Sequence, residues 1–509
     1  MRLDLNPLRF SAQEVCEKQV VSSNKALYFS LLNDLKTESL KDSSMTFLEE
    51  HIFQLKTQVK IQNQPIPTDE ASMVEWLGSH ATQIGEQYQQ YLNGRAHGEA
   101  RRYFTNKSHA LFFIKSIAPT KMVDGAWLSG FTEYWKDDKF ASLINIYLEE
   151  LGDGVSEKNH VVLFRKLLTS YGFDQFDDLN DEYFVQGAIQ LALGELTEHF
   201  LPETIGFNLG YEQLPLHLLI TAYELKELGI DPYYFTLHIT IDNASSGHAK
   251  QAAHAVFANV PLIGNQQDYF KRVCVGFQLN DAGIGTEAII KDFDIDNEFI
   301  SILKRKASIG KFMHGNHCHI EGRSINDWLS KPEEIQDFIK VLEANHWIRR
   351  NQDPKASRFW SLIDHPKAMM FGVFSPYEKQ VIYDWIAGEQ FTSVSNYAKK
   401  SDSFVVTNTN NSLDSLNIQS LAFTGRPKVA HNTNIFPLPI LQTLSTDDAK
   451  YVNDFNQDEV WLQEKINATA DKDQLMRLLS HWMSPARHHT KLGLMATRKY
   501  KAYLRFTEY

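Results

Sequence analysis

Cysteine is scarce in this chain of 509 residues. There are three, Cys16, Cys274 and Cys318, and no two of them stand in a CxxC spacing. Three thiols cannot build a disulfide framework, which is the usual reason for cysteine-rich sequences in oxidising compartments. The cysteine usage therefore favours a reduced, cytoplasmic protein.

Long hydrophobic runs and an excess of positive charge are also missing. No stretch approaches the roughly 18 consecutive apolar residues that a membrane span needs, and the opening MRLDLNPLRFSAQEV lacks the apolar core of a secretory signal. The net charge of −12 argues against a general nucleic-acid or anionic-membrane binder, whose surface would be basic. We expect a small-molecule substrate, and neither a nucleic-acid nor a membrane partner.

The composition that is present belongs to an ordinary globular protein, with 43% hydrophobic, 22% charged and 12% aromatic residues. A chain of this length is too long for one core, so we expect two or three domains. Apolar residues recur at intervals of three and four through most of the chain, which predicts amphipathic helices and a mainly α fold.

Five regions differ in pattern. Residues 1–95 are predicted to be helical and structural, and residues 96–300 to form a bundle of long helices with short connections. Residues 301–395 alternate short helices with apolar runs. They predict an α or α/β region, for which a winged-helix-like unit is an interpretation that the acidic composition disfavours. Residues 396–435 are rich in Ser, Thr and Asn and predict a polar linker or loop. Residues 436–509 return to helices as a tail.

The segment YFTLHITIDNASSGH, Tyr234–His248, combines an apolar helical pattern with ionisable residues. His238 and Asp242 are four residues apart, so on a helix their side chains lie on one face. Burying both without a partner would cost several kcal/mol. They therefore either bond to each other or hold a metal, and the spacing alone leaves both interpretations open.

Two further places carry the same residue types. Glu150 and His160 lie at either end of the turn ELGDGVSEKNH, and Glu212 is flanked by apolar residues. Carboxylates and imidazoles that project inward from facing helices form the di-iron sites of helix bundles. A set of oxygen and nitrogen ligands without thiolate suits Fe(II) or Mn(II). Taken singly, each of these residues is by default a surface residue or a helix cap.

A family resemblance joins these motifs. ELGDGVSEKNHVVLF, LGYEQ and YFTLHITIDNASSGH follow one another in an order that resembles the iron-containing redox enzymes of the heme-oxygenase-like fold, the heme-oxygenase-like di-iron oxidases and oxygenases. Glu150 and His160 match the E-x-G-x-G-x5-H pattern of that family. Glu212 matches its glutamate before a Leu-Gly helix end, and His238 and Asp242 match its H-x3-D. The resemblance spans roughly residues 100–300.

The resemblance implies a heme-oxygenase-like helical bundle with two Fe(II) per chain and O2 as co-substrate. It implies oxygenation, desaturation, C–C cleavage or N-oxygenation of a small organic molecule. An external electron donor and a homodimer are compatible with it. The implied metal ligands are Glu150, His160, Glu212, His238, Asp242 and His248.

One departure affects the second metal. The family pattern continues as H-x3-D-x2-H, but position 245 is Ser245, and the next histidine, His248, comes six residues after Asp242. Six residues turn an ideal helix by about 600°, so the two side chains would face different ways. A break within NASSG would bring His248 round. His254 is the alternative ligand.

Two other classes of function stay open. The same fold hosts enzymes without a di-iron site, including haem oxygenases and thiaminase-like enzymes that use a cysteine nucleophile. Cys274 is the only cysteine in the predicted bundle, and nothing around it suggests activation. A non-catalytic scaffold or regulator derived from the fold is the third interpretation, and the serine at position 245 is the feature that supports it.

The remaining candidates are interpreted as follows. The run MHGNHCHIEG, residues 313–322, resembles a metal cluster by composition, but it has no second half with matching spacing and is interpreted as structural. His488 and His489 stand in a basic, polar stretch and are expected to be solvated. Asp124 and Trp127 are expected to line the substrate pocket.

Overall fold

The computed structural model describes residues 23–33, 37–57, 66–241, 247–315, 317–398 and 458–505. These residues are mainly helical, as predicted, with a heme-oxygenase-like bundle in the middle of the chain and helical regions on either side. Asp242, Ser245 and nearly all of the predicted linker lie outside the described residues. Among the described helices, none is long and apolar enough to cross a lipid bilayer.

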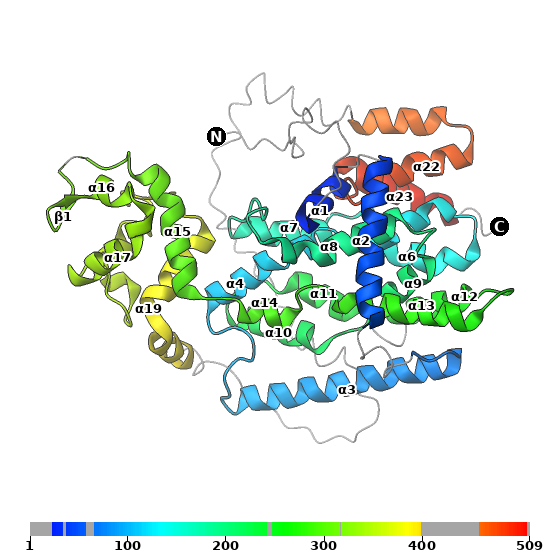
Figure 1. Ribbon diagram of the computed structural model, residues 1–509, viewed down its shortest axis with the longest axis horizontal. Coiled ribbons are helices and arrows are strands. Elements are labelled where there is room, and N and C mark those ends of the chain that lie inside the picture. The colour runs from blue at the N-terminus through cyan, green and yellow to red at the C-terminus, as the bar shows by residue number, and fades with distance from the viewer. Residues whose placement is uncertain are drawn as a thin grey trace, which may run out of the picture.

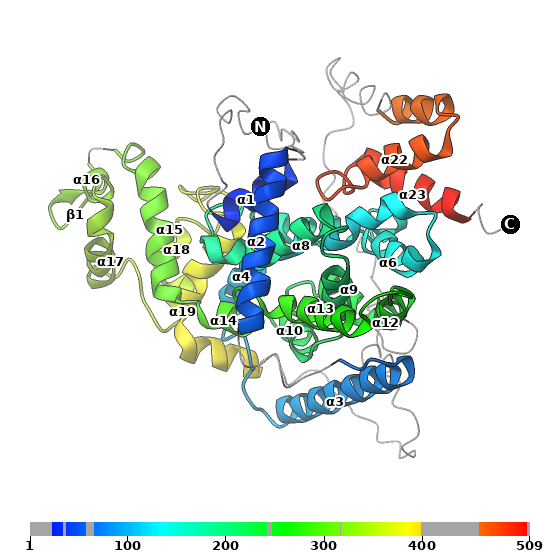
Figure 2. The ribbon, with the colours of Figure 1, turned by 45° about the vertical axis from the view of Figure 1, so that its right-hand side comes forward.

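The N-terminal region supplies three helices that lie against the bundle (Figures 1 and 2). The long third helix packs along α10 and α12, on the lower side in Figure 1. Their bounds are α1 (Asn24–Leu32), α2 (Glu38–Thr57) and α3 (Glu70–Ala96).

The bundle follows as a series of helices of up to 13 residues, interrupted by 3₁₀ turns. The α-helices are α4 (Lys107–Ser116), α5 (Ala118–Lys121), α6 (Ala141–Glu150), α7 (His160–Ser170), α8 (Val185–Glu195), α9 (Leu201–Tyr211), α10 (Leu216–Glu227), α11 (Tyr233–Ile241), α12 (His248–Ala258), α13 (Gln266–Gln278) and α14 (Thr286–Lys291). The 3₁₀ helices are η2 (Ala126–Tyr134), η3 (Asp138–Phe140), η4 (Gly152–Gly154), η5 (Asp181–Phe184) and η6 (Leu279–Asp281).

Helices α9 and α13 cross in backbone contact, because glycines face the partner helix at the crossing. A Cβ on Gly206 would lie 1.9 Å from the carbonyl oxygen of Val273, and one on Gly276 would lie 1.9 Å from that of Glu203. Any larger residue would force the two backbones apart. The crossing fixes α9, whose C-terminal end carries Glu212.

Residues 295–398 form a second lobe, on the left in Figure 1. Its final helix packs against α4, where Asp384 Oδ2 accepts a hydrogen bond of 2.8 Å from the backbone N–H of Ser108. The lobe contains α15 (Ile295–Gly310), β1 (His319–Ile320), β2 (Arg323–Ser324), α16 (Ile325–Leu329), η7 (Pro332–Glu334), α17 (Ile335–Ala344), η8 (Pro354–Ala356), α18 (Arg358–Ser361) and α19 (Pro376–Ala398). The two strands pair antiparallel, with His319 opposite Ser324.

The C-terminal helices return to the bundle and pack beside α6, as Figure 2 shows. They are a helix over residues 458–468, α22 (Lys472–Trp482) and α23 (Lys491–Arg505). The Tyr500 hydroxyl donates a hydrogen bond of 2.7 Å to the carbonyl of Thr132, and the Tyr147 hydroxyl donates one to the carbonyl of Met483. Residues more than 300 positions apart therefore share one core.

This packing makes one sequence-based expectation wrong. His488 is 1% exposed and its Nδ1 lies 3.0 Å from Asn159 Nδ2, so it is not a solvated residue of a polar tail. The loop that carries it is held between two amphipathic helices whose apolar faces lie on the bundle. Local composition showed only the polar residues around it.

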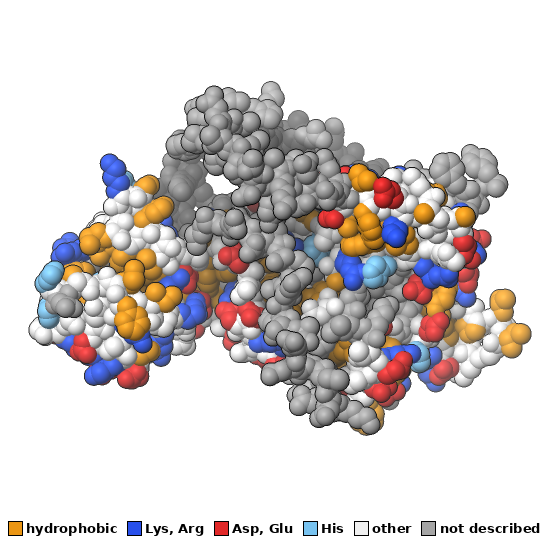
Figure 3. All heavy atoms as spheres, turned by 90° about the horizontal axis from the view of Figure 1, so that it is seen from above, with side chains coloured by type: hydrophobic (Ala, Val, Ile, Leu, Met, Phe, Trp, Pro, Cys, Tyr) orange, Lys and Arg blue, Asp and Glu red, His pale blue; other side chains and the backbone are white. Residues whose placement is uncertain are grey.

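Two clusters of buried apolar side chains fill the described part of the molecule. One contains residues of α4, α7, α8 and α11 and continues into the second lobe, and the other contains residues of α6, α9, α12, α13 and the C-terminal helices. Every carboxylate and imidazole considered below comes from an element of one of these clusters or from a connection beside it. Among the side chains that are coloured on the face shown in Figure 3, acidic and basic groups are interspersed.

Candidate metal centre

The turn between α6 and α7 brings Glu150 and His160 together. Glu150 is the last residue of α6 and His160 is the first of α7. Gly152, Asp153 and Gly154 between them all have positive φ, at 64°, 55° and 78°. A Cβ on Gly152 would lie 2.4 Å from the backbone nitrogen of Asn159, so the tight reversal requires glycine there. As predicted from the sequence, the reversal places His160 Nδ1 next to Glu150 Oε2, at 2.5 Å.

Asn159 fixes the start of α7. Its Oδ1 accepts a hydrogen bond of 3.1 Å from the N–H of Val162, which is the usual role of an N-cap. Its Nδ2 donates to the carbonyl of Leu151, also at 3.1 Å, across the turn. One fully buried side chain therefore ties both ends of the turn and orients His160.

Asp124 lies in the connection between α5 and η2 and is 1% exposed. Its Oδ1 accepts a hydrogen bond from the Tyr211 hydroxyl and its Oδ2 accepts one from the Tyr234 hydroxyl, each at 2.6 Å. Lys121 Nζ is 3.7 Å from Oδ1. Gly125 follows with a φ of 81°, and a Cβ there would lie 3.0 Å from Glu150 Cβ. Glycine thus lets the Asp124 connection approach the end of α6.

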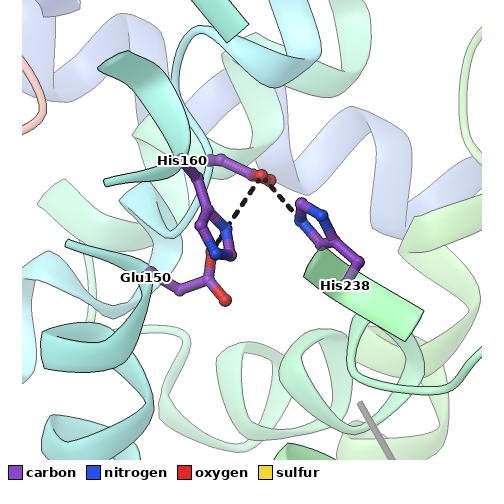
Figure 4. A group of neighbouring side chains, drawn as sticks. Glu150, His160 and His238 are labelled. Carbon is purple, nitrogen blue, oxygen red and sulfur yellow. Dashed lines mark hydrogen bonds and ion pairs between the residues drawn. The ribbon is translucent and has the colours of Figure 1, made fainter. Parts of the chain in front are cut away.

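His238 projects from α11 into the group that also contains Glu150 and His160 (Figure 4), where its ring faces Asp124. Its Nδ1 lies 2.9 Å from the carbonyl oxygen of Tyr234, and its Nε2 lies 3.2 Å from Asp124 Oδ2. Because a carbonyl can only accept, we assign the hydrogen to Nδ1. A neutral ring would then turn the lone pair of Nε2 toward a carboxylate. The arrangement requires a proton or a metal cation between the two atoms.

The pKa values of His160 and Asp124 reflect the same shortage of positive charge in this group. Burial disfavours a charged imidazole, but the negative charges of Glu150 and Asp124 outweigh it and raise the pKa of His160 to about 10. Burial opposes ionisation of Asp124 too, but Lys121 and the two imidazoles hold its pKa well below the usual range. Without a metal, a protonated His160 supplies the positive charge that faces these buried carboxylates.

A second group adjoins the first. Glu212 caps the C-terminal end of α9, and His248 begins α12 after Gly247. His248 is fully buried, and its Nδ1 lies 3.0 Å from Glu212 Oε2. Its Nε2 lies 2.9 Å from Oε2 of Glu149, a residue that is 41% exposed. The new helix start brings His248 inward, which a continuous helix from residue 242 would not do.

Glu150 belongs to both groups. Its Oε2 faces His160 Nδ1, and its Oε1 lies 3.5 Å from His248 Nδ1. Within each group, Asp124, Glu150, His160 and His238 in one and Glu150, Glu212 and His248 in the other, one potential ligand atom per residue lies within 4.8 Å of all the others. A carboxylate shared in this way is the arrangement that holds two cations close together.

The donor atoms fit a metal. Glu150 Oε2 and His160 Nδ1 are buried and lie 2.5 Å apart as an ion pair, but neither atom makes a well-aligned hydrogen bond with a described residue. Buried polar atoms without well-aligned hydrogen bonds are rare and costly in native proteins. Carboxylate and imidazole donors suit Fe(II) or Mn(II). The centre also lies at the C-terminal ends of α6 and α9, whose partial negative charge favours a cation.

The structure brings together five of the six residues predicted from the sequence, Glu150, His160, Glu212, His238 and His248. The sixth, Asp242, lies outside the described residues. The alternative ligand His254 is exposed on α12, where its Nδ1 lies 3.0 Å from Ser142 Oγ. Sequence reasoning placed Asp124 in a pocket wall and missed it as a member of the group. The feature of the sequence that could have revealed this role is the Asp124–Gly125 pair, which directly precedes an apolar, aromatic run.

The remaining candidates do not join these groups. Cys318 and His319 are exposed, and the described histidines around them form no metal-like group with acidic or cysteine side chains. Burial raises the pKa of the Cys274 thiol, which opposes the thiolate that a cysteine nucleophile needs. Trp127 is fully buried beside the centre, with its indole N–H donating 2.9 Å to Asn208 Oδ1.

Comparison with known proteins agrees with this geometry. Residues 111–281 match the model of a family described as iron-containing redox enzyme. This stretch, about a third of the chain, is similar to that family. The match confirms the resemblance seen in the sequence, and it spans every residue of both groups as well as Asp242. Neither the curated proteins nor the solved structures provide a match to the chain.

Proposed function

We propose that this chain is a non-haem di-iron enzyme that uses O2 to oxidise a small organic molecule. The observation that carries the proposal is the shared carboxylate of Glu150, which faces one imidazole of each group. A single-metal site would need no such residue. The family match supports iron and redox chemistry, and the two groups support two metals.

In this proposal the two groups divide the ligands. Asp124, His160 and His238 would hold one iron together with Glu150, and Glu212 and His248 would hold the other, with Glu150 available to both. Asp242, four residues after His238, remains an expected ligand from its spacing. Bound iron would supply one-electron redox steps and open coordination positions for O2.

The protein orients the proposed ligands and keeps bulk water away from the centre. The carbonyl of Tyr234 holds His238 so that Nε2 faces the centre, and the hydroxyls of Tyr211 and Tyr234 hold Asp124. Hydrogen-bonded supports of this kind orient ligands and tune their basicity. Phe164 and Trp127, both fully buried, help to keep bulk water from the centre. A dry site strengthens each electrostatic contact and limits side reactions.

The reaction class remains one of four: oxygenation, desaturation, C–C cleavage or N-oxygenation. Among the acidic residues at the centre, Glu149, which lies half-buried beside His248, is the most exposed to solvent. We place substrate entry on that side. Some of these reactions consume more electrons than the substrate yields. For those reactions we propose an external electron donor that would return the irons to Fe(II) after turnover.

The test is anaerobic loading with Fe(II), removal of excess metal, and metal analysis, followed by rapid mixing with O2. We expect close to two irons per chain and a transient visible absorbance. Iron content near zero, with no absorbance change, would refute the proposal and favour a non-catalytic scaffold. Saturable haem binding by the metal-free chain would instead favour a haem oxygenase.

A single substitution checks the ligand assignment. His238→Ala removes an imidazole that belongs to the first group and not to the group of Glu150, Glu212 and His248, so we expect loss of one iron and retention of much of the other. Circular dichroism establishes that the fold is kept. Wild-type iron content in this variant would contradict the assignment of His238.

A further inference from the structure

A second concave site lies outside the metal centre. A cavity of about 480 Å³ opens between the outer face of α7 and the loop that joins α22 to α23. It is lined by Val162, Arg165, Lys166, Thr169, Ser170 and His489, none of which belongs to either metal group. Arg165 and Lys166 follow the ligand residue His160 by five and six positions, so they leave α7 in other directions.

The lining carries positive charge from Arg165 and Lys166. Neither Arg165 nor Lys166 lies within 4.0 Å of a carboxylate oxygen of any described residue. Glu157, whose pKa is lowered mainly by Ser156 and only slightly by Lys166, is fully exposed before the helix. In a chain with a net charge of −12, two adjacent cations that form no ion pair with the described residues reverse the local sign of charge at this cavity.

The two hydroxyl groups at the cavity do not add donors. Thr169 Oγ1 donates to the carbonyl of Arg165 at 2.8 Å, and Ser170 Oγ donates to that of Leu167 at 2.7 Å. Both hydroxyl hydrogens are therefore used within the helix. Recognition of a ligand in this cavity falls to the two cations and to His489.

His489 has a ring nitrogen that awaits a partner. Its Nδ1 is buried and has no hydrogen-bond partner among the residues that the structure describes. Burial, and then the positive charge of Arg165, hold the pKa of His489 at about 3, so the ring is neutral at physiological pH. A neutral imidazole carries one N–H, and either nitrogen can carry it. A ligand oxygen near Nδ1 would select the tautomer that donates to it.

We propose that this cavity binds the anionic group, a carboxylate or a phosphate, of a small molecule. Arg165 and Lys166 provide the charge, and the planar guanidinium offers two parallel N–H groups to a pair of oxygens. His489 provides a neutral donor from the opposite wall. The proposal does not depend on the proposed oxidation, because no lining residue belongs to the metal centre.

The cavity also has a structural path to the metal centre. His488, next to His489, contacts Asn159 Nδ2 through its own Nδ1 at 3.0 Å. Asn159 in turn caps α7 directly before His160. An anion that draws Arg165 and His489 together would hold the 483–490 loop against α7. Binding would therefore protect both segments from local opening.

The experiment uses the metal-loaded full chain at constant ionic strength and pH 7.5. Inorganic phosphate and malonate are titrated separately by calorimetry, and hydrogen exchange is then followed by mass spectrometry with and without each anion. We expect saturable binding of one anion per chain, with slower exchange in residues 160–170 and 483–490. The variant Arg165→Gln/Lys166→Gln should bind at least tenfold more weakly.

The control is Lys291→Gln/Lys340→Gln, which removes the same charge at two highly exposed lysines away from the cavity. It should bind as the wild type does. Saturable binding of phosphate alone supports a phosphate ligand, and saturable binding of malonate alone supports a carboxylate ligand. Saturable binding of both supports a site that recognises negative charge in either form. Absence of saturable binding would overturn the proposal. So would binding that survives in the double variant, because that anion would be on the metals.

Discussion

Glu150→Gln tests the central feature of the proposed site, the carboxylate that both groups share. The substitution keeps the size of the side chain and removes one negative charge. Glu150 is 3% exposed, with one oxygen 2.5 Å from His160 Nδ1 and the other 3.5 Å from His248 Nδ1. The change therefore acts where water cannot replace the lost charge.

The magnitude follows from the burial of the pair. Removing one partner of a buried charge pair costs about 3–5 kcal/mol. At about 1.4 kcal/mol per factor of ten, this predicts a loss of roughly 10²–10⁴ in affinity for a metal that uses the carboxylate. Because the carboxylate faces both groups, both metals should weaken. A ligand that belongs to one metal only would weaken that metal alone.

The assay is anaerobic calorimetric titration with Fe(II), together with metal analysis of the purified variant and a thermal melt to establish folding. The matched control is Glu149→Gln, the same chemical change one residue earlier on the same helix. Glu149 is 41% exposed and its carboxylate pairs with His248, which belongs to one group, so its loss should weaken one metal, and by less. Two tightly bound irons in Glu150→Gln would refute the shared-carboxylate reasoning. Loss of one metal with the other unchanged would refute it as well.

Three further outcomes are expected. At pH 7 metal binding should release at least one proton per chain, because the pKa of His160 is about 10 without metal. Calorimetry in buffers of different ionisation enthalpy measures the number of protons released. Release of no proton would contradict a protonated His160. Asn159→Ala removes the cap of α7, which is worth about 1 kcal/mol. It also leaves buried hydrogen-bond partners unsatisfied, at roughly 1–3 kcal/mol each. Urea unfolding should therefore show that the free energy of unfolding falls by at least about 2 kcal/mol. Burial raises the pKa of Asp384 from 3.8 to about 6, so the folded state binds the proton more tightly and loses stability as pH rises between these values. Asp384→Asn should therefore gain up to about 3 kcal/mol relative to wild type between pH 4 and pH 7, and an equal difference at both pH values would sink this reasoning.

Much of the fold and of the candidate site was predictable from local sequence. The three- and four-residue apolar periodicity predicted helices, and α6, α7 and α11 lie where their patterns indicate. The glycines of ELGDG predicted a reversal, because only glycine readily adopts positive φ at a turn this tight. The reversal is sufficient to pair Glu150 with His160, since both residues lie within eleven positions of the chain.

Contacts between distant segments were not predictable in this way. Asp124 joins the centre because Tyr211 and Tyr234 donate to it across about 90 and 110 positions, and no local pattern encodes such a partner. His488 is buried because two helices far along the chain, α22 and α23, pack on η2 and η4, although its own neighbours are polar. Residue types and turns set the local geometry, whereas burial depends on what else packs there.

The sequence by itself determined the helical class, the turn that pairs Glu150 with His160, and the choice of oxygen and nitrogen donors. Tertiary structure decided that Asp124 faces the imidazoles, that His248 turns inward at a new helix start, and that one carboxylate serves both groups. The physical reason is that donor chemistry and backbone turns are local properties. The electrostatic need for a cation arises only when several buried carboxylates and imidazoles converge from separate helices.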